Sequence, residues 1–375
     1  MPKKGSSVAD HFGSIPDPRI NRTKRHLLND ILVISICAVI CSADDWVAIE
    51  QFGKAKKQWF RGFLRLPNGI PSHDTFGRVF AALDQKAFAS CFTSWIQSVA
   101  NITDGEVVAI DGKTLRRSFD RASGKAAIHM VSAWASANGL VLGQVKTEAK
   151  SNEITAIPKL LEILDLRGCI VTIDAMGCQK EIAKNIIDKD AHYIFGLKGN
   201  QGNLHADVEA YFQEALNRDF VGTSYDFIEQ KDHGHGRDEC RRLWCTNDLK
   251  WFAKRAEWKG LQSIAMIEEE RIIAGKKSVE RRYFISSLPG DDAKRFGHAV
   301  RLHWGIENGL HWVLDVAFRE DECRVRTGNA PENFATLRHI ATNLLKSEHT
   351  AKVGVKNKRL KAGWDENYLR TVLGI

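Results

Sequence analysis

Glu106-Val-Val-Ala-Ile110-Asp111-Gly112 is a short apolar run closed by an acidic residue and a glycine. This pattern predicts a buried strand that ends at Asp111. Two more strand patterns follow, at about 127–136 and 140–146, and the Asn138-Gly139 pair between them is a strong signal for a hairpin turn. We therefore expect three consecutive strands in a meander.

Beyond this meander the pattern alternates between helix and strand. Residues 153–165 carry apolar side chains at helical spacing, with Asn152 as a cap, and the apolar run 169–173 ends at Asp174. A helix over about 179–189 and a strand over 192–197 come next. Three antiparallel strands followed by alternating helices and strands specify a mixed sheet in an α/β layer.

The flanking regions differ from this core. The first hundred residues predict helices near 28–41 and 46–63, a turn at 66–71, and a helix capped by Ser72 that carries Thr75 and Arg78. A helix, a turn and a capped helix are typical of DNA-reading helix pairs, and an ordinary helical packing domain fits the pattern equally well.

Four strand-like pieces between about 219 and 290 predict a β insertion, and helices follow at about 292–316 and 332–346. The expected division is a helical domain at 1–100, an α/β domain at 101–345 and a basic tail at 346–375.

The charge is concentrated at the ends of the chain. The 375 residues hold 54 Lys and Arg against 46 Asp and Glu, and the excess lies within 1–100 and 346–375. Basic ends around a near-neutral body suit a protein that holds nucleic acid, although solvated surface charge is the simpler alternative. A hydrophobic content of 43% argues against disorder and against an integral membrane protein.

The apolar run Ile31–Ile40 is too short to span a bilayer and predicts a buried helix. No signal-peptide pattern follows the basic start, so a cytoplasmic protein is expected. Eight cysteines without a C-x-x-C pair predict reduced structural thiols.

Three acidic residues are the candidates for chemistry. Asp111 and Asp174 each follow a predicted strand, although a lone Asp in this place is often only a helix cap. Glu307 lies in a helical pattern between His303 and His311, each four residues away, and these three side chains are expected on one helical face.

Gly305 and Gly309 in the same helix imply a close approach to another backbone, because glycine is costly inside a helix. Carboxylate ligands select Mg²⁺ or Mn²⁺, and two such ions can promote phosphodiester chemistry. Zinc is disfavoured because no H-E-x-x-H pattern is present.

Two weaker candidates follow. Lys198, in Lys198-Gly-Asn-Gln201, could hold a phosphate, although a polar turn explains it as well. Arg237 ends the loop His233-Gly-His-Gly-Arg237, whose small residues would let a backbone approach a phosphate.

Several longer motifs, in order along nearly the whole chain, closely resemble the insertion-sequence DDE transposases of the H-repeat-associated branch. They are Asp111-Gly-Lys-Thr-Leu-Arg116, Gly143-Gln-Val-Lys146, 150–158, Thr172-Ile-Asp-Ala-Met-Gly-Cys-Gln179, Leu197-Lys-Gly-Asn-Gln201, 234–237, His303-Trp-Gly-Ile-Glu-Asn308 and Leu310-His-Trp-Val-Leu-Asp315. Residues 10–95 look like the helical domain that accompanies this transposase core.

The resemblance implies a ribonuclease H-like domain, two divalent metal ions, and Asp111, Asp174 and Glu307 as the acidic triad. It implies an enzyme that cleaves at the inverted-repeat ends of its element, joins the 3′-OH ends to target DNA, and acts as a dimer on double-stranded DNA in the cytoplasm, at the nucleoid. The wider group often has Tyr, Arg and Lys around its helical Glu, where this chain has Val300, His303 and Leu314.

His303 is therefore the candidate for a DNA contact at the position of the usual Arg. Trp304 or Trp312 could stack on a flipped base, as the resemblance suggests for related enzymes. Two alternatives stay open: a transposase-derived DNA-binding protein without catalysis, and a metal-dependent nuclease without strand transfer.

Overall fold

The strand predicted from Glu106 is longer than expected. In the computed structural model, which describes residues 11–100, 102–119, 124, 126–148, 152–234 and 237–375, β1 covers Val107–Leu115 and passes through Asp111. The prediction that this strand ends at Asp111 is therefore wrong. The strand continues because it has two neighbours: β4 pairs with it as far as Ile110, and β2 is its neighbour on the other side.

Contacts within the chain define two units, and β1 contributes to both. The first unit contains Met1–Asn101, Gly112–Lys150 and Glu307–Ile375, and the second contains Ile102–Asp111 and Ser151–Ile306. This division does not follow the expected boundaries at 100 and 345, since the first unit takes residues from all three expected segments. Asp111 and Asp174 belong to the second unit, and Glu307 begins the last segment of the first.

The second unit contains a mixed sheet. Its strands are hydrogen-bonded in the order β1-β4-β5-β9-β8-β7-β6, with β1, β4 and β5 parallel and the others antiparallel. These strands are β4 (Ile170–Ile173), β5 (His192–Leu197), β6 (Asp226–Gly234), β7 (Arg237–Thr246), β8 (Ser263–Ile273) and β9 (Lys276–Ser286). The predicted mixed sheet is confirmed. The four strands expected between 219 and 290 are present, and they continue the main sheet because β9 pairs with β5.

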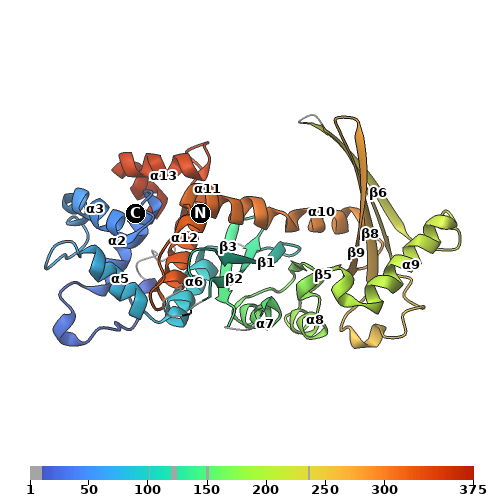
Figure 1. Cartoon of the computed structure of the whole chain (residues 1–375), viewed down its shortest axis with the longest axis horizontal. Coiled ribbons are helices and arrows are strands. Elements are labelled where there is room, and N and C mark those ends of the chain that lie inside the picture. The colour runs from blue at the N-terminus through green and yellow to red at the C-terminus, as the bar shows by residue number, and fades with distance from the viewer. Residues whose placement is uncertain (1–10, 101, 120–123, 125, 149–151, 235–236) are drawn as a thin grey trace. The chain divides into compact units, whose positions relative to one another are not determined.

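Helices cover both faces of this sheet. Helix α10 lies on one face, and α7 and α8 lie on the other (Figure 1). The core under α10 joins Val107, Ile170 and Ile194 of the strands to Phe296 and Val300 of the helix. The helices of this unit are α7 (Glu153–Ile163), α8 (Lys180–Ile187), α9 (Asn203–Asn217) and α10 (Ala293–His303), with short turns η2 (Ala175–Gly177), η3 (Gly199–Gln201) and η4 (Arg255–Glu257). Helix α9 was not predicted.

The two outer hairpins of this unit form a long arm, labelled β6, β8 and β9 in Figure 1. Strand β9 pairs with β5 only from Tyr283 onward, so residues 276–282 and their partners extend past Leu197, the last residue of β5. Ion pairs stabilise the arm: Arg241 of β7 contacts Glu269 of β8 at 2.5 Å and Glu239 of its own strand at 2.7 Å.

The first unit is mainly helical, as the sequence predicts for its N-terminal part. Helix α12 is buried along nearly its whole length and packs against α2, α5, α6 and β3. Its elements are η1 (Asn21–Thr23), α2 (Leu28–Ile40), α3 (Trp46–Ala55), α4 (Lys57–Phe60), α5 (His73–Ala82), α6 (Gln85–Val99), β2 (Ile128–Ala135), β3 (Leu140–Lys146), η5 (Glu307–His311), α11 (Trp312–Phe318), η6 (Glu320–Glu322), α12 (Ala330–Ser347), α13 (Val355–Trp364) and α14 (Glu366–Leu373).

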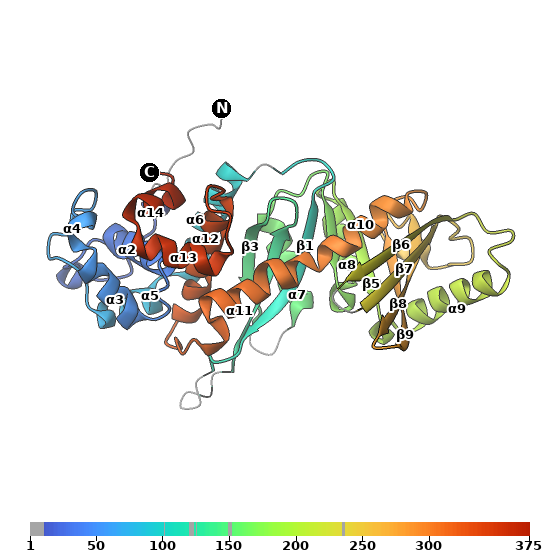
Figure 2. The same ribbon diagram turned by 90° about the horizontal axis from the view of Figure 1, so that it is seen from above.

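The segment expected as a basic tail is folded. Helices α13 and α14 lie beside α12 within this unit (Figure 2), and Arg359 is 1% exposed. Part of the positive charge at this end of the chain is therefore used inside the protein.

The apolar run 31–40 forms the buried helix α2, as predicted. Among the residues that the structure describes, no helix is long and apolar enough to cross a membrane. All eight cysteines are free thiols.

Candidate active site

Asp111 lies in β1, and Asp174 directly follows the neighbouring strand β4, both in the second unit. The parallel pairing of β1 and β4 ends at the partners Ile110 and Ile173, and each Asp is the next residue. Adjacent strands are about 4.8 Å apart, and side chains alternate between faces, so the register assigns Asp111 and Asp174 to the same face of the sheet. Thr172 occupies the same face of β4, which is the face that α10 covers.

Asp174 also has a structural role. Its Oδ1 accepts a hydrogen bond from the backbone N–H of Met176 at 3.0 Å, which caps the turn η2. The turn lies tight against β4, because a Cβ atom on Gly177 would come within 2.3 Å of Ile173 Cγ2. The capping role that the sequence left open is therefore present, and it fixes the direction of the Asp174 carboxylate.

His303, the last residue of α10, has a partner inside the protein. A hydrogen bond of 3.0 Å joins its Nδ1 to Oγ1 of Thr172. Burial lowers the pKa of His303, and the nearby charge of Asp174 only partly opposes this shift. The ring is therefore neutral at pH 7 and anchors α10 to β4.

Glu307 begins a π-helical turn rather than continuing a regular helix. Helix α10 ends at His303, and η5 covers Glu307–His311. The helix predicted over 292–316 is therefore divided into α10 and α11, with the π turn η5 preceding α11. A π turn changes the angular spacing of side chains, and such turns are frequent at functional sites. The Glu307 side chain is exposed.

The predicted close approach at Gly309 is present, and its partner is a ring rather than a backbone. A Cβ atom on Gly309 would lie 2.8 Å from Cζ2 of Trp134 in β2. Lys346 of α12 places its ammonium 5.0 Å from the centre of the same ring. Trp134 thus fixes the π turn that carries Glu307, within the first unit.

The ligand types at these positions fit a hard cation. Asp111, Asp174 and Glu307 offer only carboxylate oxygens, which Mg²⁺ and Mn²⁺ prefer. No group of three or more His, Cys, Asp and Glu side chains lies close enough to hold a metal ion, within the part of the chain that the structure describes. The structure brings Asp111 and Asp174 together, and Glu307 belongs to the other unit.

The predicted phosphate-binding residues lie at different places in the second unit. Lys198 is exposed directly after β5, where Asn200 Nδ2 and Gln201 Nε2 donate to the Ala175 carbonyl at 2.9 and 3.3 Å. Lys198 is therefore at the same end of the sheet as Asp174. Arg237 is at the tip of the arm, with its Nε 3.3 Å from Glu239. The neighbouring His235 and Gly236 lie outside the described residues.

Thr75 and Arg78 lie on α5, whose predicted cap is confirmed. Ser72 Oγ accepts from the Thr75 backbone N–H at 3.4 Å, and the Thr75 hydroxyl lies 3.1 Å from that of Ser72. Arg78 is exposed, and its Nε donates to the Asp74 carbonyl. A DNA contact by this helix stays a prediction.

Sequence reasoning missed three contacts. Arg282 stacks over the Trp304 ring at 5.4 Å, Gly309 packs on Trp134, and Lys113 binds carboxylates more than 200 residues away. The glycine spacing gave a partial signal for the second contact. The Lys113 contacts join residues far apart in the chain, which a single sequence does not reveal, and no local pattern pointed to the contact of Arg282 with Trp304.

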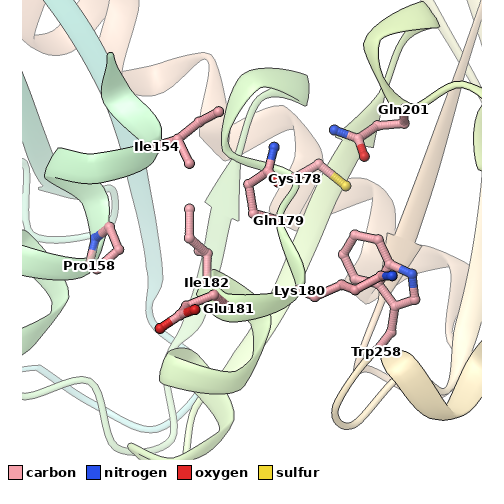
Figure 3. Close-up of a pocket in the computed structure, with 9 residues that line it drawn as sticks. All are labelled: Ile154, Pro158, Cys178, Gln179, Lys180, Glu181, Ile182, Gln201 and Trp258. Atoms are coloured by element: carbon pink, nitrogen blue, oxygen red, sulfur yellow. The ribbon is translucent and has the colours of Figure 1, made fainter. Parts of the chain in front are cut away.

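A pocket of about 520 Å³ lies between α7, α8 and the turns beside them (Figure 3). It is on the face of the sheet opposite α10, so it is distinct from the row of Thr172 and Asp174. Its lining combines Ile154, Pro158, Ile182 and Trp258 with Cys178, Gln179, Lys180, Glu181 and Gln201. Lys180 is already paired with Glu257.

Comparison with known proteins agrees with the resemblance seen in the motifs. Residues 9–96 match the family described as DDE_Tnp_1-associated, and residues 102–344 match the family described as Transposase DDE domain. "Putative transposase YncI" of Escherichia coli is 47% identical over 371 residues, 98% of this chain and 94% of that protein. "H repeat-associated putative transposase YhhI" of Escherichia coli is 41% identical over 372 residues, 98% of this chain and 97% of that protein.

Among solved structures, a piggyBac transposase synaptic complex with hairpin DNA gives a TM-score of 0.43 at 11% identity, over 97% of this chain and 75% of that chain. This likeness is too low to carry an argument. The two family matches, and the Escherichia coli relatives that align over 98% of this chain, do support an assignment. They agree with the motifs found between Asp111 and Asp315. This chain therefore belongs to the insertion-sequence DDE transposases, in the H-repeat-associated branch.

Proposed function

We propose that this protein is an active DNA transposase that cleaves at the terminal inverted repeats of its element and joins the 3′-OH ends to target DNA. The observation that carries the proposal is the position of Asp111 and Asp174, one residue beyond paired residues of adjacent parallel strands. Asp174 directly follows β4, and carboxylates at the carboxyl ends of parallel strands are typical of catalytic sites in α/β sheets. Asp111 lies where the parallel pairing of β1 with β4 ends. Membership in the DDE transposase family supports the same assignment.

Asp111, Asp174 and Glu307 would hold Mg²⁺ or Mn²⁺, with two ions at the site. When bound, such ions activate an attacking oxygen and stabilise the leaving oxygen of a phosphodiester. Asp174 enters this role already oriented, because its Oδ1 is fixed by the Met176 N–H. Hydrolysis and strand transfer differ only in the nucleophile, which is water in the first and a DNA 3′-OH in the second.

The DNA contacts are assigned by charge and position. Lys198 would bind backbone phosphate near the carboxylates, Arg237 would do so at the arm, and Thr75 and Arg78 would contact DNA from α5. His303 is the weakest of these candidates because Thr172 already binds its ring. We further propose a ribonuclease H-like catalytic domain at 101–345, a DNA-binding helical domain at 1–100, and a homodimer that holds two ends.

The test is cleavage of a supercoiled plasmid that carries the element's own terminal repeats, with Mg²⁺, by the full chain and by Asp174→Asn. Asn keeps a cap acceptor for Met176, so the variant removes the charge and preserves the turn. Loss of cleavage with retained DNA binding would support the assignment, whereas equal cleavage by both proteins would overturn it. Cleavage without joined products would identify a nuclease, and binding without cleavage by the unaltered protein would identify an inactive DNA-binding descendant.

A further inference from the structure

Lys113 lies two residues after Asp111 in β1, and its ammonium is almost enclosed. The side chain is 12% exposed, and Nζ lies 2.7 Å from Asp315, 3.2 Å from Glu320 and 3.2 Å from Asp321. In the structure its positive charge is already satisfied by three carboxylates of the same unit.

These carboxylates lie on the segment that carries Glu307. Asp315 is on α11, which follows the π turn of Glu307 without a break. Glu320 and Asp321 are on η6, at the other end of α11. Lys113 therefore attaches β1 to the helix that continues from Glu307, and the contacts all lie within the first unit.

Glu320 connects this attachment to the most buried helix of the unit. Its Oε1 lies 3.4 Å from Arg338 Nη1 of α12, and its Oε2 lies 3.2 Å from Lys113 Nζ. The Glu320 and Arg338 side chains are each 2% exposed. Because α12 is packed on several sides, Glu320 gives Lys113 a rigid support.

The charges of the cluster balance. Asp315, Glu320 and Asp321 face Lys113, Arg338 and Arg116, whose Nε lies 3.1 Å from Asp321. An ammonium in contact with three carboxylates has no charge left for DNA.

We propose that Lys113 is a positioning residue, whose ammonium holds α11 against β1 and thereby fixes Glu307 for metal binding. This inference rests on the proposed role of Glu307 as a metal ligand. It assigns no contact between Lys113 and DNA. Residues that orient metal ligands typically change metal affinity by about 10–100-fold when they are removed.

The test compares Lys113→Met with Lys146→Met in the full chain. Lys146 is the matched control, because it is also a strand lysine that pairs with a buried carboxylate. Its partner is Glu332 of α12, at 2.5 Å, so the pair does not involve α11. We would measure Mn²⁺ binding by calorimetry without DNA, binding of an element-end duplex by gel shift in EDTA, and thermal stability. Lys113→Met should weaken Mn²⁺ binding about tenfold or more and leave duplex binding within about twofold.

Lys146→Met should cost stability without changing Mn²⁺ affinity, and Lys113→Arg should restore most of the Mn²⁺ affinity. Asp315→Asn gives a second route, since it weakens the same attachment from α11 even where Lys113→Met does not fold. Wild-type Mn²⁺ affinity in Lys113→Met, or a tenfold loss of duplex binding with Mn²⁺ affinity intact, would overturn the proposal. Asp174→Asn separates the two proposals: if it too binds Mn²⁺ normally, the metal site itself is misassigned.

Discussion

Replacing Arg359 with Met should strongly destabilise the first unit, because this guanidinium is buried and fully used. It is 1% exposed and donates to the Val39 carbonyl at 2.8 and 3.2 Å, to the Ala317 carbonyl, and to Asp44 at 2.6 Å. Its Cζ also lies 4.0 Å from the centre of the Phe318 ring. Val39 and Ala317 are at the C-terminal ends of α2 and α11, where carbonyl groups have no partner within the helix. The Val39 carbonyl also accepts from the Ser42 backbone N–H at 3.3 Å, so it keeps one donor when Arg359 is replaced.

The expected loss can be worked from these contacts. Loss of the donor to the Ala317 carbonyl costs about 1–3 kcal/mol, and removal of one partner from a buried ion pair costs about 3–5 kcal/mol. These costs overlap, and the Met side chain recovers some contact with Phe318. Burial raises the pKa of Asp44, against the influence of Arg359, so this carboxyl can take up a proton once the guanidinium is gone. We expect a net loss of about 3–5 kcal/mol in the free energy of unfolding.

The assay is equilibrium urea unfolding of the full chain, followed by circular dichroism at pH 7. Lys356→Met is the matched control, since it removes the same charge from an exposed position of α13 and should change stability by less than about 0.5 kcal/mol. A loss below about 1 kcal/mol for Arg359→Met would refute the reasoning. It would mean that α13 does not hold α2 and α11 through this side chain.

Three further predictions concern the candidate site and its support. Asp174→Ala should lose about 0.5–2 kcal/mol of stability because it removes the cap on η2, while Asp174→Asn should lose less; equal urea midpoints would contradict the cap. Gly309→Val should cost at least about 1–3 kcal/mol, because its side chain would collide with Trp134, and an unchanged midpoint would count against that contact. Burial, with help from Arg338, lowers the pKa of His339 to about 3, so the unfolded state takes up a proton below pH 6.5 that the folded state does not. Stability should therefore fall as pH falls from 6.5 towards 3, by at most about 1.4 kcal/mol per unit from this group, and His339→Phe should flatten the fall; identical pH slopes would rule this out.

Local patterns predicted most of the elements around Asp111 and Asp174. The strands 140–146 and 192–197 have their predicted bounds, and the hairpin at Asn138-Gly139 is present. These predictions were correct because a short apolar strand that is followed by turn residues is determined mainly by its local sequence. The end of β1 was missed because its continuation depends on β2, and the register of neighbours is a property of the sheet rather than of the strand.

The region of Glu307 shows a different limit. A period of 3.6 residues predicted one helix through Glu307, whereas the backbone forms a π turn there. Two tertiary contacts accompany this turn: Gly309 allows Trp134 to approach, and Lys113 contacts Asp315 of α11. Trp134 and Lys113 are both more than 150 residues from this segment, so helical periodicity alone could not predict these contacts.

The sequence analysis suggested that the basic residues at both ends of the chain bind nucleic acid. The structure reduces the number of these residues that are available for such contacts. The excess of Lys and Arg at the two ends suggested segments that hold DNA, yet Lys358 and Arg359 are buried and bind backbone carbonyls. The charge of Lys113 is also used within the protein, because three carboxylates neutralise it. A basic residue contributes to DNA affinity only where its charge is still accessible to phosphate. Under the proposed function, neutralising exposed residues such as Lys198, Arg78 and Lys356 should therefore lower the salt dependence of DNA binding, whereas loss of Arg359 should act through stability.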